Sequence, residues 1–228
     1  MKITYIHHSG FSIELDKCVL LFDYFKGELP KWNRNKSIYA FSSHGHHDHF
    51  SSVIFNLEKE YTNVTYVLSD DIKVKKSANI YFVKPNDTFH INDLEIKTLE
   101  STDLGVAFIV KAESKLFYHA GDLNYWHWEG ELTDEENYNF GVRYKKELNK
   151  ISDLDFDVSF VPLDPRQQDQ YNFGFDTFMK NINTRYIFPM HFWMDYSIID
   201  KILSDKCSKS YRNKIIKITK ETEEFILE

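Results

Sequence analysis

The sequence is poor in cysteine and lacks both long apolar runs and an excess of basic residues. Its 228 residues include two cysteines, Cys18 and Cys207, which excludes a cysteine-based zinc module and a disulfide framework, although one bridge between them stays open. No stretch approaches the roughly 20 apolar residues that span a bilayer, and the N-terminus does not read as a signal peptide. We therefore expect a cytoplasmic protein without membrane contact, with both cysteines as free thiols.

The charge balance is mildly acidic. The chain carries 28 Lys and Arg against 35 Asp and Glu, which gives a net charge of −7 with neutral histidine. A general nucleic-acid binder shows a broad basic surface, so the composition disfavours a nucleic-acid partner. Hydrophobic residues at 42% and charged residues at 28% are typical of a packed soluble globule rather than a disordered chain.

No repeat, low-complexity tract or linker divides the chain, so residues 1–228 are predicted to form one domain. Strand patterns dominate the first half, at 2–6, 11–15, 18–23, 37–42, 64–68, 80–83, 88–91, 94–99, 106–111 and 115–119. The second half adds strands at 157–162, 185–189, 214–218 and 224–227. Helices are expected after Ser51, after Thr133 with Glu136 at capping-box spacing, around 175–182, and after Asp195. This order predicts two packed sheets with helices outside.

Residues 44–49 read His-Gly-His-His-Asp-His and lie between an apolar strand and a capped helix. Histidine and carboxylate are first-rank ligands for zinc and similar divalent ions. Residues two apart in an extended segment point the same way, so His44 and His46 can bind one ion together. Asp48 and His49 follow at the turn and point elsewhere, so one loop can offer two ligands to each of two ions. A solvent-exposed histidine tract is the alternative, and the position between two packed elements disfavours it.

This motif resembles the His-x-His-x-Asp-His signature of the metallo-β-lactamase-fold hydrolases. Asp23 resembles the early acidic residue of that family, which orients the metal loop. Asp122 resembles the carboxylate that bridges both ions, and His191 resembles the final histidine ligand. The resemblance extends to about residue 195. It implies a four-layer αβ/βα sandwich with the metal site at one edge of the two sheets.

The segments 3–14 and 117–122 are most similar to the ascorbate-6-phosphate lactonase-like branch of that superfamily. The resemblance implies one or two divalent ions, with zinc preferred and manganese or iron as alternatives. A metal-activated water would cleave an ester, lactone or phosphodiester bond of a small anionic substrate, with Asp48 binding both metal and nucleophile. A nuclease or phosphodiesterase and a metal-binding protein with little catalysis are the alternatives. The oligomeric state stays open, a homo-oligomer included.

The sequence departs from the family at one ligand. The family usually supplies a further histidine before the bridging aspartate, and residues 99–105 contain none. Asp103 can take that place, which would make the site richer in oxygen and more tolerant of manganese or iron. A weakened first site, or a displaced His119 or His127, are further alternatives. A turn role beside Gly105 explains Asp103 equally well.

Other polar residues flank the proposed centre. His8, His119 and His127 are candidates to hydrogen-bond a ligand or the substrate, while His7, His47 and His90 are expected to lie apart from it. Arg166 follows a buried strand and is a candidate clamp for phosphate or carboxylate. Pairing of Arg166 with a nearby aspartate, such as Asp164, is the alternative that we prefer.

Overall fold

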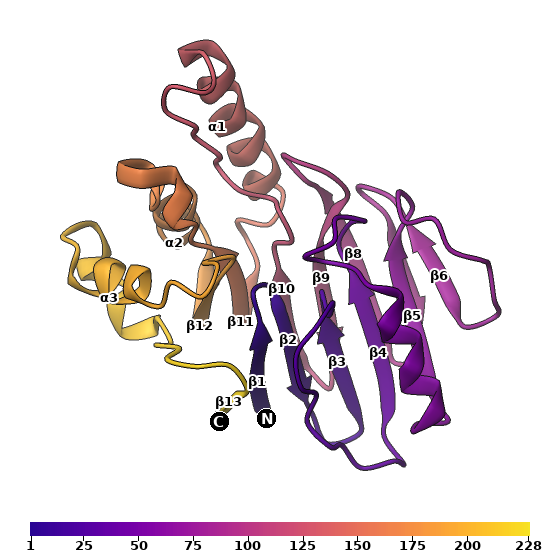
Figure 1. Ribbon diagram of the computed structural model, residues 1–228. Coiled ribbons are helices and arrows are strands. Elements are labelled where there is room, and N and C mark those ends of the chain that lie inside the picture. The colour runs from indigo at the N-terminus through magenta and orange to yellow at the C-terminus, as the bar shows by residue number, and fades with distance from the viewer.

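Two mixed β-sheets lie face to face in the computed structural model, which describes residues 1–228 (Figure 1). The first sheet has the spatial order β13-β1-β2-β3-β4-β5-β6. Its strands are β1 (Lys2–His7), β2 (Gly10–Glu14), β3 (Cys18–Phe22), β4 (Ser37–Ser42), β5 (Val64–Ser69), β6 (Ile80–Val83) and β13 (Glu223–Ile226). The second sheet has the order β12-β11-β10-β9-β8-β7. Its strands are β7 (Thr88–Ile91), β8 (Leu94–Glu100), β9 (Val106–Ala112), β10 (Lys115–His119), β11 (Asp155–Pro162) and β12 (Asn183–Met190).

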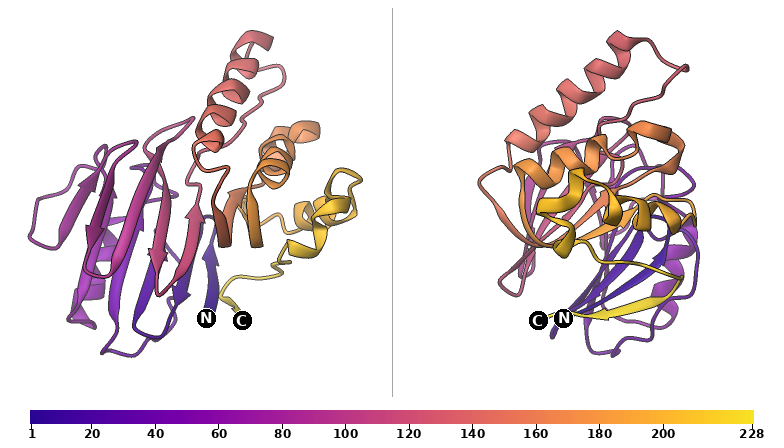
Figure 2. Two further views of the ribbon diagram at one scale, coloured as in Figure 1. Left: turned by 180° about the vertical axis from the view of Figure 1, so that it is seen from behind. Right: turned by 90° about the vertical axis from the view of Figure 1, so that its left-hand side faces the viewer.

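Helices cover the outer faces of this pair of sheets. They are α1 (Asp134–Asn149), α2 (Phe173–Asn181), α3 (Ser197–Ser204) and the 3₁₀ helices η1 (Ser52–Lys59), η2 (Pro165–Gln170), η3 (Cys207–Ser210) and η4 (Arg212–Lys214). Helices α1 to α3 gather where β11 and β12 lie (Figure 2). On the second sheet, Phe178 of α2 stacks on Tyr118 of β10 at 5.1 Å. The architecture is the αβ/βα sandwich that the resemblance implies.

Strand β3 shows why these sequences form buried strands. Leu20 and Phe22 belong to the core between the sheets, whereas Val19 and Leu21 belong to the cluster beneath η1. Side chains alternate across a strand, so a strand enclosed on both faces is apolar throughout. Phe22 stacks on His119 of the opposite sheet at 4.9 Å. The strand that precedes Asp23 is therefore packed against core residues on both faces.

The parallel strands determine where the polar loops meet. Strands β3 to β6 run parallel to one another in the first sheet, and β10 to β12 do so in the second. The carboxyl ends of parallel strands share one edge of a sheet, where ligands commonly bind. Five segments with polar side chains follow such ends, namely Asp23, residues 43–49, Asp122, Asp164 and His191.

Most of the predicted elements are confirmed, with three differences. The helix after Ser51 is a 3₁₀ helix, in which the buried residues Ile54 and Leu57, three positions apart, share a face. Helix α3 begins at Ser197, whose backbone N–H donates to Asp195. The strand predicted at 214–218 is wrong, because η4 occupies its start and Ile215 makes only an isolated bridge to the second sheet. The capping box at Thr133 is confirmed.

None of the helices combines the length and the apolar character that crossing a bilayer would require. Cys18 and Cys207 are both unpaired. The two ends of the chain lie together, because β13 pairs antiparallel with β1 (Figure 1).

Candidate metal centre

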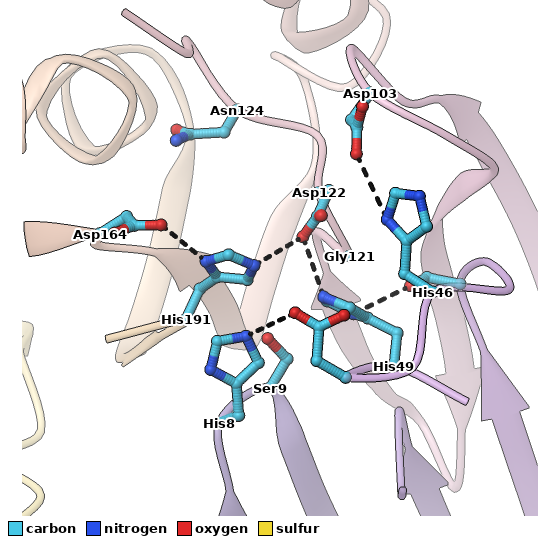
Figure 3. Close-up of polar contacts among 12 residues, drawn as sticks. His8, Ser9, His46, His49, Asp103, Gly121, Asp122, Asn124, Asp164 and His191 are labelled. Carbon is cyan, nitrogen blue, oxygen red and sulfur yellow. Dashed lines mark hydrogen bonds and ion pairs between the residues drawn. The ribbon is translucent and has the colours of Figure 1, made fainter. Parts of the chain in front are cut away.

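Two groups of potential metal ligands lie together at the strand ends (Figure 3). The first ligand group comprises His44, His46, Asp103 and Asp122, and the second comprises His8, Asp48, His49 and His191. Within each group the potential donor atoms lie within 4.8 Å of one another. The two groups divide the loop 44–49 in the way that side-chain alternation predicts.

Asp122 joins the two groups. Its Oδ2 lies 3.5 Å from Nε2 of His44, and its Oδ1 lies 3.2 Å from Nε2 of His49 and 3.4 Å from Nε2 of His191. Figure 3 shows Asp122 between the histidines. A carboxylate placed in this way can offer one oxygen to each of two adjacent ions.

The backbone of the metal loop directs its side chains to both groups. The N–H of Gly45 donates to Oδ2 of Asp71 at 2.7 Å, which anchors the loop as it leaves β4. The N–H groups of His49 and Phe50 both donate to the carbonyl of His46, at 3.0 and 2.9 Å. This tight turn separates Asp48 and His49 from the two histidines that precede them. The role of Asp71 has no signal in the sequence, because it depends on a contact between loops.

Asp23 and Ser43 orient two of the histidines. Asp23 is fully buried and accepts hydrogen bonds from the N–H and Oγ of Ser43 and from Nδ1 of His49, each at 2.7 Å. Ser43 Oγ in turn accepts from Nδ1 of His44 at 3.0 Å. Ligating histidines commonly donate their second nitrogen in this way, which leaves Nε2 for the metal. The predicted position of Asp23 beside the metal loop is therefore observed, and Ser43 was not anticipated.

Asp164 orients the third histidine. Its Oδ2 accepts from Nδ1 of His191 at 3.0 Å, and its two oxygens also accept from Nε and Nη2 of Arg166 at 2.5 to 3.0 Å. Arg166 is therefore paired with Asp164, the alternative that the sequence favours, and it lies over the rings of Trp128 and Trp193. The link from Asp164 to His191 was not predicted, although Asp164 follows β11 just as Asp122 follows β10.

Asp103 lies on the solvent side of the centre. Its Oδ2 is 3.7 Å from Nδ1 of His46, and the two side chains are 48% and 50% exposed. The loop can approach this closely because Gly105 has a φ of +70° and no Cβ, which would otherwise lie 2.0 Å from the carbonyl oxygen of Ser43. The structure thus places Asp103 among the potential ligands, in the region where the family histidine is absent.

The other histidines of interest do not join the ligand groups. His119 is buried, donates from Nε2 to the carbonyl of Ser9 at 2.9 Å and accepts from the N–H of Gly121 at 3.2 Å. It supports the backbone on either side of the centre. His127 pairs with Glu129 at 3.0 Å. Three further histidines lie outside the groups, with His7 bonded to Glu221 and His47 and His90 exposed.

Electrostatics favours a cation at this centre. Burial opposes the charged form of Asp122, but His49 and His191 outweigh it and hold the pKa of Asp122 well below its ordinary value. Burial likewise opposes a charge on His49, yet Asp122 and Asp23 raise the pKa of His49 well above its usual value. Burial and the charge of His49 lower the pKa of His44 to about 4, so its imidazole is neutral and free to ligate. The carboxylates therefore stabilise a positive charge that a bound ion would supply.

Several buried atoms of the centre lack hydrogen-bond partners. They include Nε2 of His49, Oδ1 of Asp122 and both ring nitrogens of His8. Leaving a buried polar group unpaired costs about 1–3 kcal/mol, so such atoms call for a ligand. The donors are nitrogen and oxygen without thiolate, a set that suits zinc, manganese or iron. The residues present thus fit two adjacent divalent ions.

Comparisons with known proteins agree with this geometry. Residues 2–191 match the family model described as the β-lactamase superfamily domain. The chain is 26% identical over 216 residues to a UPF0173 metal-dependent hydrolase of Bacillus cereus, covering 84% of the chain and 86% of that protein. It is also 26% identical over 142 residues to a UPF0173 metal-dependent hydrolase of Opitutus terrae, covering 54% of the chain. This match spans 63% of the Opitutus protein, less than two thirds of that protein's length.

A solved structure shares the fold. The structure of Igni18, described as a novel metallo hydrolase from the archaeon Ignicoccus hospitalis, aligns with a TM-score of 0.65 and 17% identity, and covers 100% of this chain and 99% of that one. The narrower likeness to the lactonase branch stays a prediction. The strand order, the ligand geometry and the match over residues 2–191 together show that the chain belongs to the β-lactamase superfamily.

Proposed function

We propose that this chain is a metal-dependent hydrolase that cleaves an ester, lactone or phosphodiester bond in a small anionic substrate. The observation that carries the proposal is the pair of ligand groups that share Asp122. His44, His46, Asp103 and Asp122 would hold one ion. Asp48, His49, His191 and Asp122 would hold the other.

Divalent ions held by these residues would activate a water for attack and polarise the bond to be cleaved. The chain supplies the orientation. Asp48 has its carboxylate in the second group and can accept a hydrogen bond from the attacking water. Asp23 and Asp164 hold His49 and His191 with Nε2 toward the centre. Trp126 donates from its indole nitrogen to the carbonyl of Asp122 at 3.0 Å and fixes the backbone of that residue.

The preference for an anionic substrate is supported by Arg166. Its side chain is 48% exposed beside the centre, and Asp164 binds its Nε and Nη2. Nη1 stays available to a carboxylate or phosphate oxygen, and the rings of Trp128 and Trp193 hold the guanidinium plane in place. Zinc is the preferred ion, because each set contains two histidines and imidazole suits zinc. The exposed carboxylate of Asp103 favours manganese or iron more strongly in the first.

Metal removal and reconstitution test this function. The protein is stripped with a chelator, and the metal content is measured together with hydrolysis of a p-nitrophenyl ester, a lactone and bis-p-nitrophenyl phosphate. We expect hydrolysis of at least one substrate to disappear on stripping and to return with zinc, manganese or iron. Hydrolysis that survives complete metal removal would refute the proposal.

A matched pair of variants tests the ligand assignment. His46→Ala removes a ligand of the first group, and His47→Ala removes the neighbouring histidine, whose side chain is 89% exposed. We expect His46→Ala to lose bound metal and activity together, while His47→Ala keeps both. Equal metal content and activity in the two variants would show that the assignment of His46 is wrong.

A further inference from the structure

We propose that His8 is a fifth protein ligand, which binds the second ion through Nε2. This assignment rests on the proposed metal centre. It adds a residue that lies well before the motif at 44–49 in the sequence. His8 directly follows β1, so it reaches the second ligand group from a strand that carries no part of the His-x-His-x-Asp-His motif.

The distances place His8 among the ligands. Its Nε2 lies 3.5 Å from Oδ2 of Asp48, and its ring centroid lies 4.2 Å from that of His191 and 5.7 Å from that of His49. Ligands bound to a common ion at about 2.0–2.2 Å must themselves lie within about 4.4 Å of one another. The separation between His8 and Asp48 satisfies this limit.

His8 has no other partner in the fold. The side chain is 1% exposed, and neither Nδ1 nor Nε2 makes a hydrogen bond. Buried polar side chains are almost always hydrogen-bonded, so an imidazole whose only polar contact is Asp48 at 3.5 Å needs an explanation. An ion in the second group would satisfy Nε2. The neighbouring His7 differs, because its Nδ1 bonds to Glu221.

The backbone directs His8 toward the centre. Its φ of +56° is uncommon for a residue other than glycine, and such conformations cluster at functional sites. The N–H of His8 donates to the hydroxyl of Tyr5 at 3.0 Å, and its carbonyl accepts from the N–H of His191 at 3.4 Å. The ring of Trp193 packs against the His8 ring at 4.3 Å. The fold therefore holds this imidazole beside His191 in a fixed orientation.

A fifth donor makes the two sites unequal. The second ion would have His8, Asp48, His49, His191 and Asp122 around it, all buried. The first ion would have four donors, two of which are about half exposed. The second site is therefore expected to fill first and to hold its ion more tightly, while the first ion exchanges more readily with solvent.

Cobalt titration of the full-length metal-free protein tests the assignment. Co²⁺ reports its coordination through visible absorption, which is stronger for four than for five ligands. His8→Asn is the test variant, since asparagine tolerates the left-handed backbone and is too short to reach the ion. His7→Asn is the matched control on the adjacent histidine, which bonds to Glu221 and lies outside both ligand groups.

We expect two phases for the wild-type protein and for His7→Asn. In His8→Asn the affinity of the tighter phase should fall by roughly 100-fold. Removing a residue that only orients a ligand weakens metal binding by about 10–100-fold, so loss of a direct ligand should reach at least the upper end of that range. The absorption of this phase should also become more intense. If metal-free His8→Asn proves unfolded by circular dichroism, His8→Gly carries the same test, because glycine tolerates the left-handed backbone and offers no side-chain donor.

The outcomes separate this assignment from the proposed function. Co²⁺ binding by His8→Asn with wild-type affinity and spectrum would overturn the role of His8 as a ligand, even if hydrolysis fell. Such a result would point instead to contact with the substrate. Failure of the wild-type protein to bind Co²⁺ would overturn the metal centre itself, and with it this assignment.

Discussion

Replacing Asp103 with asparagine tests how the chain manages without the usual family histidine. The substitution keeps the shape of the side chain and removes its charge. Burial and the charge of Asp122 raise the pKa of Asp103, so its carboxylate is unfavourable while no metal is bound. The same charge is favourable beside a divalent ion. Asp103→Asn should therefore have effects of opposite sign on the metal-free and metal-loaded protein.

The two magnitudes differ because of solvent exposure. Asp103 is 48% exposed, so solvent screens its repulsion from Asp122 and the metal-free protein should gain at most about 0.5 kcal/mol. Replacing a charged oxygen donor with a neutral amide should weaken the first site by about 100-fold, or about 2.8 kcal/mol. At saturating metal this loss lowers the stability directly. For a chain of 228 residues it corresponds to a fall in Tm of roughly 5–10 °C.

Calorimetric unfolding with and without metal provides the assay. Glu100→Gln is the control, since it removes one exposed negative charge from the preceding strand end without touching either ligand group. We expect only Asp103→Asn to lower the Tm of the loaded protein, and neither variant to lower that of the stripped protein. Two ions bound by Asp103→Asn with wild-type affinity would refute its role as a ligand and favour a turn role beside Gly105.

Three other perturbations address the support of the centre. Asp164→Asn should weaken metal binding at the second site by roughly 10–100-fold in a chelator competition, because the acceptor that fixes the His191 ring loses its negative charge. Gly105→Ala should destabilise the protein by more than about 2 kcal/mol in urea unfolding. Gly130 also has a positive φ, but a Cβ there would have no atom within 4 Å. Gly130→Ala should therefore show only the backbone strain, of about 1–2 kcal/mol. Burial opposes the charge of Glu14, but the nearby Lys36 and Lys2 outweigh burial and lower the pKa of Glu14. The ion pairing therefore stabilises the fold above about pH 4.5, and this stabilisation is lost as the pH falls through the pKa of the folded state. Glu14→Gln should thus cost about 0.5–1 kcal/mol at pH 7 and progressively less below pH 4.5, as measured by urea unfolding. An unchanged metal affinity in Asp164→Asn, equal losses in the two glycine variants, or a pH-independent effect of Glu14→Gln would each contradict the corresponding reasoning.

The sequence predicts the parts of this molecule that depend on local periodicity. Strand β3 reads as an unbroken apolar run because both of its faces are covered. The loop 44–49 divides between two ligand groups because alternate side chains point in opposite directions. Residues 215–218 read Ile-Ile-Lys-Ile and have the local character of a strand, yet they make only an isolated parallel bridge, from Ile215 to Ile187 of β12. Periodicity alone could not reveal that difference.

The contacts that Asp164 and His8 make could not be predicted, because they depend on how distant segments approach one another. Asp164 reaches His191 because β11 and β12 are adjacent parallel strands, a pairing that no local pattern specifies. His8 turns into the centre through a left-handed backbone conformation, which no residue type signals reliably outside glycine. A site built at strand ends therefore shows its motif and the residues that a family resemblance marks in the sequence, whereas contacts such as those of Asp164 and Asp71 appear only in the fold.

The departure at Asp103 is best understood together with Gly105. An aspartate side chain is shorter than a histidine, so a carboxylate reaches the first group only if its loop lies closer to the metal loop. The N–H of Val106 donates to the carbonyl of Ser43 at 2.9 Å, and the missing Cβ of Gly105 leaves room for this contact. The same contact holds Ser43, which orients His44. The loop that carries Asp103 therefore also fixes His44 through Ser43. Both the replacement oxygen donor and the orientation of His44 depend on the close approach of the Gly105 backbone to the Ser43 carbonyl.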